Sequence, residues 1–188
     1  MPIGAEEGAL FANESYTMLR KDGKTGNRKK NIETINKNIF KTGYTVVNDK
    51  KHTNKDQVTF INDKGHIHIS HRGSDLTGKK TSEDLSTWFP IARGATSENE
   101  HFKRRLTMTE KTLEAYPNAD YVTGSSHSYG GSSLYSTILG SQIARDRFDK
   151  IHTYNAGASV FRTAHENQIT PEQRKSIRGV VTHHRVAG

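Results

Sequence analysis

The chain has 188 residues, enough for a single domain with its own core, and it carries a formal charge of +8 with a pI near 9.6. Its mean hydropathy is −0.82, no stretch reaches the length of a membrane-spanning helix, and the N-terminus does not resemble a signal peptide. Because cysteine is absent, disulfides and thiolate metal sites are excluded. The sequence leaves the location undecided between a cytoplasmic and a virion-associated protein.

The first part of the chain predicts two helices and then short strands. Residues 5–20 have a partial apolar face, and residues 32–41 place isoleucines at helical spacing before Gly43. Residues 44–48, 57–61 and 66–71 have the pattern of strands. The Asn-Asp-Lys-Gly segment at 62–65 predicts a hairpin turn between the last two strands.

The remainder alternates between helices and strands. A polar loop at 73–82 and a helical region around Trp88 precede a long predicted helix at 98–116. Predicted strands at 121–124, 150–155 and 179–185 then alternate with predicted helices at 130–145 and 171–176. This order predicts one α/β domain over residues 1–188, with a mostly parallel sheet and helices on both faces.

The positive charge is concentrated in short runs of lysine and arginine, among them residues 28–30, 50–51, 79–80 and 103–105. One interpretation is an anionic partner, either an anionic membrane surface or an acidic protein. The other is a set of solvated loops and helix faces. Few aromatic residues accompany these runs and no nucleic-acid motif occurs, so the sequence does not indicate specific nucleic-acid binding.

The segment most suggestive of chemistry is VTGSSHSYGG at residues 122–131. A predicted strand leads directly into Ser128, small residues surround it, and a helix follows. A nucleophile elbow needs small neighbours because its turn is sharp and strained, and here Ser126 takes the place of the usual first glycine. The N-terminus of the next helix offers N–H groups to a developing oxyanion. The alternative is a Gly/Ser-rich turn without chemistry.

Several segments together resemble class 3 lipases. The HRGS segment at 71–74 is similar to the [FH]-R-G-[ST] segment of that family, and SHSYGG at 126–131 is similar to its G-H-S-L-G-G elbow. Further similarity, in the family's order, occurs at residues 9–20, 84–89, 102–104, 116–118 and 153–158. The resemblance implies an α/β-hydrolase fold and a lipase or esterase activity. Such proteins occur in fungi, protists and large DNA viruses.

The resemblance also implies the roles of individual residues. Ser128 is the expected nucleophile, and Ser74 with the backbone N–H of Tyr129 is the expected oxyanion hole. The helices before Gly43 and around Trp88 are candidates for a lid.

The triad aspartate and histidine of the family have no match in this sequence, because they follow the strand that resembles residues 180–188. The domain is therefore expected to lack its C-terminal part, and three interpretations remain. The polypeptide is longer, another histidine (His127, His183 or His184) acts as the base, or the protein is a degenerate hydrolase. A serine hydroxyl is a weak nucleophile without a base.

The predicted function is a serine hydrolase of carboxylic esters, such as acylglycerols or phospholipids, that needs no cofactor. The alternative is a degenerate hydrolase-fold protein with a structural or binding role, for example as a virion or particle component. His66 and His68 would place two imidazoles on one face of a strand, as a metal site requires. No carboxylate or third histidine has a fitting spacing, so no metal site is predicted.

Overall fold

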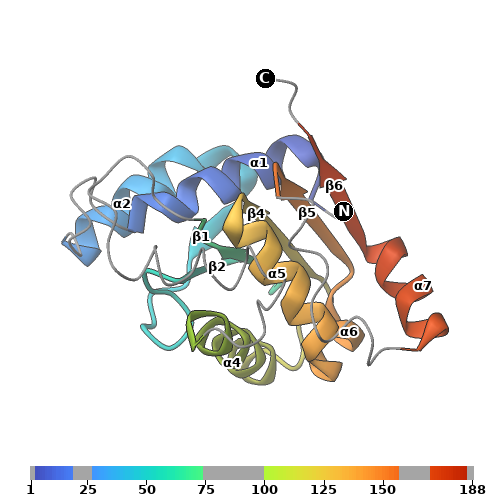
Figure 1. Ribbon diagram of the computed structural model, residues 1–188. Coiled ribbons are helices and arrows are strands. Elements are labelled where there is room, and N and C mark those ends of the chain that lie inside the picture. The colour runs from blue at the N-terminus through green and yellow to red at the C-terminus, as the bar shows by residue number, and fades with distance from the viewer. Residues whose placement is uncertain (1–2, 19–26, 74–99, 157–169, 186–188) are drawn as a thin grey trace.

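The computed structural model describes residues 3–18, 27–73, 100–156 and 170–185, and it places a sheet between helices (Figure 1). The strands of this sheet are β1 (Tyr44–Val46), β2 (Gln57–Asn62), β3 (Ile67–His71), β4 (Val122–His127), β5 (Lys150–Tyr154) and β6 (Val181–His184). The helices are α1 (Ala5–Glu14), α2 (Arg28–Asn38), α4 (Glu100–Ala115), α5 (Tyr129–Gly140), α6 (Gln142–Arg147) and α7 (Pro171–Val180). Short 3₁₀ helices follow α1 and α2, at Ser15–Met18 and Phe40–Thr42.

The six strands lie in the order in which they occur in the sequence. Strands β1, β2 and β3 pair antiparallel, whereas β3, β4, β5 and β6 pair parallel. The hairpin between β2 and β3 turns at Gly65, whose φ of 76° favours glycine. This arrangement confirms the predicted α/β fold with a mostly parallel sheet.

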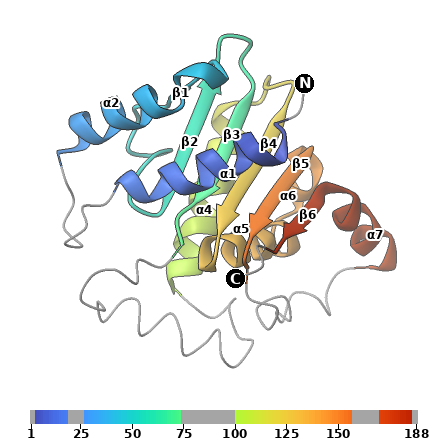
Figure 2. The same cartoon turned by 90° about the horizontal axis from the view of Figure 1, so that it is seen from above.

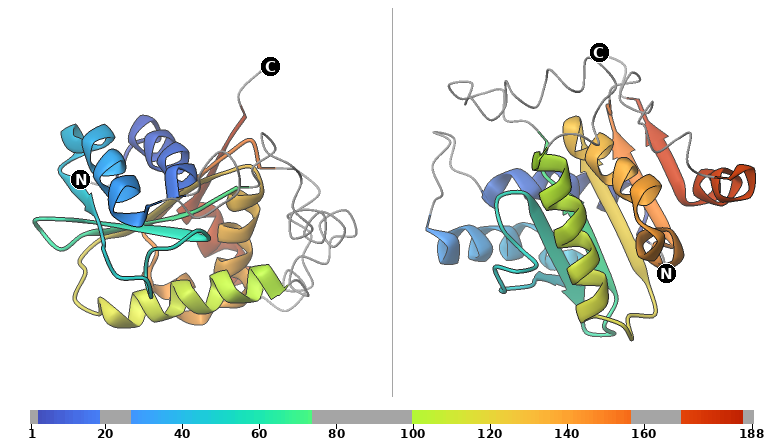
Figure 3. Two further views of the ribbon diagram at one scale, coloured as in Figure 1. Left: turned by 90° about the vertical axis from the view of Figure 1, so that its left-hand side faces the viewer. Right: turned by 60° about the horizontal axis from the view of Figure 1, so that its bottom comes forward.

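The chain order also explains which helices cover which face. Right-handed connections between successive parallel strands place their helices on one face of the sheet, and α4, α5 and α6 lie there. Helices α1 and α2 precede the sheet and cover the opposite face (Figures 2 and 3). The site described below lies where α1 and α5 approach β4 from the two sides.

Each face has its own hydrophobic core. Ile67 and Ile69 of β3 pack with residues of α5 such as Leu134 and Ile138. On the other face, Phe11 of α1 packs against Phe60 of β2 and against the ring of His68. Because side chains alternate along a strand, β3 contributes its isoleucines to one core and His68 to the other.

Several predicted boundaries needed correction. The predicted helix at 130–145 is two helices, because Ser141 ends α5 and its hydroxyl caps α6 by accepting from the Ala144 N–H at 3.3 Å. Helix α2 begins before residue 32, since the side chain of Asn27 accepts from the Lys30 N–H. Strand β4 extends to His127 rather than ending at Gly124.

Other predictions cannot be compared with the structure. The loop at 73–82 beyond Gly73, the helical region around Trp88 and the proposed lid there lie outside the described residues. Among the helices that are described, none combines the length and apolar character needed to cross a membrane.

Candidate active site

Ser128 has a strained backbone at the junction of β4 and α5. Its φ is 54° and its ψ is −129°, a conformation that glycine adopts readily and other residues seldom do. Such a conformation costs on the order of 1–3 kcal/mol and is concentrated at functional sites. The Ser128 N–H donates to the Tyr154 carbonyl at 2.9 Å, which holds the turn against the end of β5.

The glycines that follow Ser128 allow α5 to approach the sheet closely. A Cβ on Gly130 would lie 2.2 Å from the carbonyl oxygen of His71, and one on Gly131 would lie 3.0 Å from the Cβ of Ala156. A side chain at Gly130 would therefore overlap the backbone at the end of β3. The sequence signal for the elbow thus has a steric cause, which is the direct contact between the start of α5 and the backbone at the end of β3.

Ser126 also has a specific structural role. Its hydroxyl accepts a hydrogen bond from the His71 N–H at 2.9 Å and donates to the Ser125 carbonyl at 2.6 Å. A glycine could not make these contacts. The serine that replaces the usual first glycine therefore joins β4 to β3, directly before Arg72 and Gly73.

Tyr16 links the N-terminal segment to the elbow. Its hydroxyl lies 3.0 Å from Nδ1 of His127, and a Cβ on Gly73 would lie 2.0 Å from the same hydroxyl. Burial lowers the pKa of His127, so its ring is neutral at neutral pH. Tyr16, His127 and Gly73 therefore meet at one point beside Ser128.

The expected oxyanion hole is described only in part. Tyr129 is the first residue of α5, and N–H groups in the first turn of a helix have no partner within the helix. The positive end of the helix dipole is at the same place. Ser74 lies outside the described residues, although its neighbour Gly73 lies next to His127.

The histidines considered as a base have other ring partners. His127 contacts Tyr16, as described above. Nδ1 of His183 lies 2.6 Å from the Thr153 hydroxyl, and Nε2 of His184 lies 2.9 Å from Nδ1 of His152. Each of these contacts engages one of the two nitrogens of its ring.

A pocket of about 280 Å³ lies beside the elbow, between α1 and the ends of β4 and β5. Small side chains and polar side chains share its wall. They are Ala9, Ala12, Asn13, Tyr16, His127, Tyr154 and Asn155. Its volume is slightly below the range of about 300–1,000 Å³ that is typical of ligand pockets, and it opens to solvent.

The histidine pair at 66 and 68 does not form a shared site. The His68 ring is buried and lies between the hydroxyls of Thr123 and Ser125, both at 2.8 Å, while the His66 ring packs against Tyr121. Burial lowers the pKa of His68 to about 3. Within the described residues, no group of three or more potential ligands is placed to hold a metal ion.

The basic run at 103–105 is not uniformly solvated, which corrects one interpretation of the sequence. The side chain of Lys103 is 56% exposed and that of Arg104 is 51% exposed, whereas Arg105 is buried. Helical periodicity indicates that Arg105 lies on the buried face of α4, because it follows buried Phe102 by three residues and precedes buried Thr109 by four. The run of three basic residues hides this pattern when the sequence is read for charge alone.

Comparison with known proteins adds no family assignment. No model of a known protein family matches this chain, and no curated protein matches it significantly. The resemblance to class 3 lipases therefore depends on the motifs themselves.

Proposed function

We propose that this protein is a serine hydrolase of carboxylic esters, of the class 3 lipase type, with Ser128 as the nucleophile. The observation that carries the proposal is the strained backbone of Ser128 at a strand-to-helix turn. Strain of this kind is kept where a turn must present a side chain in one position, as a nucleophile elbow does. The α/β sheet and the contacts of Gly130 support the same conclusion.

In the proposed reaction the Ser128 hydroxyl oxygen attacks the acyl carbonyl and its proton passes to a base. Negative charge develops on the carbonyl oxygen, where the Tyr129 N–H and the positive end of α5 stabilise it. Ser74 supplies the second donor, as the family resemblance implies. The alcohol then leaves, and water hydrolyses the acyl-enzyme.

The small pocket beside the elbow suggests the kind of ester. Asn13, Asn155 and Tyr16 give its wall hydrogen-bonding groups, while Ala9, Ala12 and the ring of Tyr154 give it apolar surface. A carboxylic ester has both a polar carbonyl group and an apolar chain, so this mixed lining fits the proposed class of substrate.

Labelling with a fluorophosphonate tests the proposal. The full chain is incubated with the probe and its intact mass is measured, beside Ser128→Ala and Ser176→Ala. Ser176 is an exposed serine of α7, so its variant is a control for accessibility alone. One adduct that Ser128→Ala loses and Ser176→Ala keeps is the expected result. No adduct on the folded protein contradicts the proposal.

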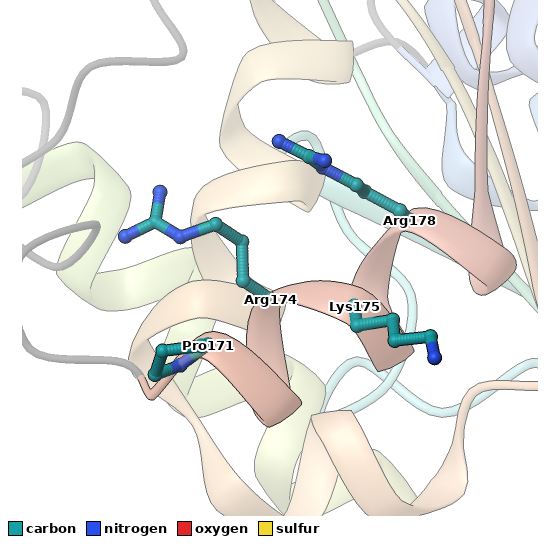
Figure 4. Close-up of a pocket in the computed structure, with 4 residues that line it drawn as sticks. All are labelled: Pro171, Arg174, Lys175 and Arg178. Carbon is teal, nitrogen blue, oxygen red and sulfur yellow. The ribbon is translucent and has the colours of Figure 1, made fainter.

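A second candidate function follows from α7. Arg174, Lys175 and Arg178 of this helix line a pocket of about 370 Å³, with Arg174 and Arg178 extending to one side of the helix and Lys175 to the other (Figure 4). Such a group of cations favours an anionic partner. The candidate is a degenerate hydrolase-fold protein that docks an anionic membrane or an acidic protein. Salt-sensitive binding to acidic liposomes, reduced in Lys175→Gln with Arg178→Gln, is its test.

A further inference from the structure

The buried guanidinium group of Arg105 packs against the ring of Tyr129, the residue that follows Ser128. The Arg105 side chain comes from α4 and is 1% exposed. Its guanidinium carbon lies 5.0 Å from the centre of the Tyr129 ring, an arrangement that stabilises a cation weakly. Tyr129 itself is 5% exposed. The side chain next to the nucleophile is therefore packed against a buried positive charge.

The charges around Arg105 do not balance. Asp56 supplies one carboxylate, which lies 3.3 Å from His101 Nε2, 3.5 Å from Arg104 Nη2 and 3.9 Å from Arg105 Nη2. Arg72 is also buried, and its positive charge lowers the pKa of Arg105 further after the larger effect of burial. Among the described side chains, the two buried guanidinium groups of Arg72 and Arg105 therefore face one carboxylate. A buried cation without full compensation is costly.

Three donors in this cluster have no acceptor. Nε and Nη1 of Arg105 and the Tyr129 hydroxyl are buried and donate no hydrogen bond in the described part of the protein, and Oδ1 of Asp56 accepts none there. Burial raises the pKa of Tyr129, so the hydroxyl remains protonated and can donate at neutral pH. Buried polar groups in folded proteins are nearly always bonded. The cluster therefore has the donors and the charge of an anion site.

Its position suggests what kind of anion binds. Arg72 directly follows β3, and Tyr129 directly follows the proposed nucleophile. In α/β proteins, ligands bind at the carboxyl ends of the parallel strands. A group bound at this cluster would lie beside the ester bond that Ser128 attacks, rather than on a remote surface.

We propose that Arg105 and Tyr129 form an anion subsite that binds a carboxylate or phosphate group carried by the substrate. The preferred substrates are then esters with a negative charge near the scissile bond. Guanidinium groups suit this task because they bind oxyanions strongly and stay charged. This inference rests on the proposed hydrolase function, but anion binding itself can be measured without turnover.

The binding experiment uses Ser128→Ala protein with inorganic phosphate as the probe, titrated calorimetrically at constant ionic strength. Arg105→Met in that background is expected to weaken phosphate binding at least about tenfold, the ratio that corresponds to one charged hydrogen bond. Lys103→Gln removes the same charge from the solvated side of α4 and is expected to leave binding within about twofold. Equal binding by the Ser128→Ala protein and by the Ser128→Ala protein that also carries Arg105→Met overturns the proposal.

Tyr129→Phe keeps the experiment decisive if Arg105→Met does not fold. This change removes the hydroxyl and leaves all charges in place. Phosphate affinity is expected to fall severalfold, since one donor to the anion is lost. Unchanged affinity in Tyr129→Phe, with Arg105→Met unfolded, contradicts the subsite.

A kinetic comparison separates a substrate-borne anion from free phosphate. Two p-nitrophenyl esters of the same chain length are compared, one with a neutral butyryl group and one with an anionic succinyl group. Arg105→Met is expected to lower the ratio of kcat/KM for the succinyl ester to kcat/KM for the butyryl ester at least about tenfold. Equal losses for both esters overturn substrate binding at this site. Phosphate binding without cleavage of either ester supports the subsite and contradicts the hydrolase.

Discussion

The backbone of Ser128 provides the sharpest test of the nucleophile elbow. Its φ of 54° and ψ of −129° are a backbone conformation that is favourable for glycine and unfavourable for alanine or serine. We therefore expect Ser128→Gly to be more stable than Ser128→Ala. Both changes remove the hydroxyl, so the difference between them reports the backbone alone.

The size of the difference follows from two opposing effects. Relief of the strain at Ser128 stabilises the glycine variant by about 1–3 kcal/mol. The greater freedom of glycine in the unfolded chain removes about 0.5–1 kcal/mol of that gain. The net expectation is about 1 kcal/mol in favour of glycine, which for a domain of this size raises Tm by about 2–4 °C.

Urea denaturation followed by circular dichroism measures this difference directly. Ser176 of α7 is the control position, because it is exposed and lies in an ordinary helix. There the order reverses, and the glycine variant is expected to be about 1 kcal/mol less stable than the alanine variant. If glycine is the less stable variant at both positions, Ser128 is not strained and the elbow interpretation fails.

Three further predictions concern contacts around the site. Gly130→Ala places a Cβ 2.2 Å from the His71 carbonyl oxygen. We therefore expect urea denaturation to show a destabilisation of about 1–3 kcal/mol, and we expect fluorophosphonate labelling to be lost. Unchanged stability and labelling would contradict the close contact between the start of α5 and the end of β3. Tyr16→Phe removes the 3.0 Å contact to His127 and is expected to cost about 1 kcal/mol, whereas Tyr121→Phe, a half-exposed control, costs less. His68 has a folded-state pKa of about 3, below the ordinary value of 6.5, so the unfolded chain binds a proton in this window that the folded protein does not. The free energy of unfolding should therefore fall as pH decreases from 6.5 towards 3, by up to about 1.4 kcal/mol per pH unit, and less steeply in His68→Gln; equal slopes refute the assignment.

The sequence by itself determined much of the local structure and the position of the strand-to-helix turn at Ser128. Apolar periodicity and turn residues located most helices and strands of the described part, and Gly65 marked the hairpin between β2 and β3. The spacing of small residues around Ser128 indicated a sharp turn, because only small residues fit such a turn. These features depend on residues that are close in the sequence, so a sequence pattern is enough to predict them.

The tertiary structure alone decided which distant groups meet. The sequence gives no sign that Ser126 bonds the His71 N–H or that Tyr16 reaches His127. Helical periodicity places Arg105 on the buried face of α4, but the sequence gives no sign that its guanidinium lies against the Tyr129 ring. Which distant groups pair depends on how β3, α4 and α5 pack together in space, and the order of residues along the chain does not contain that information.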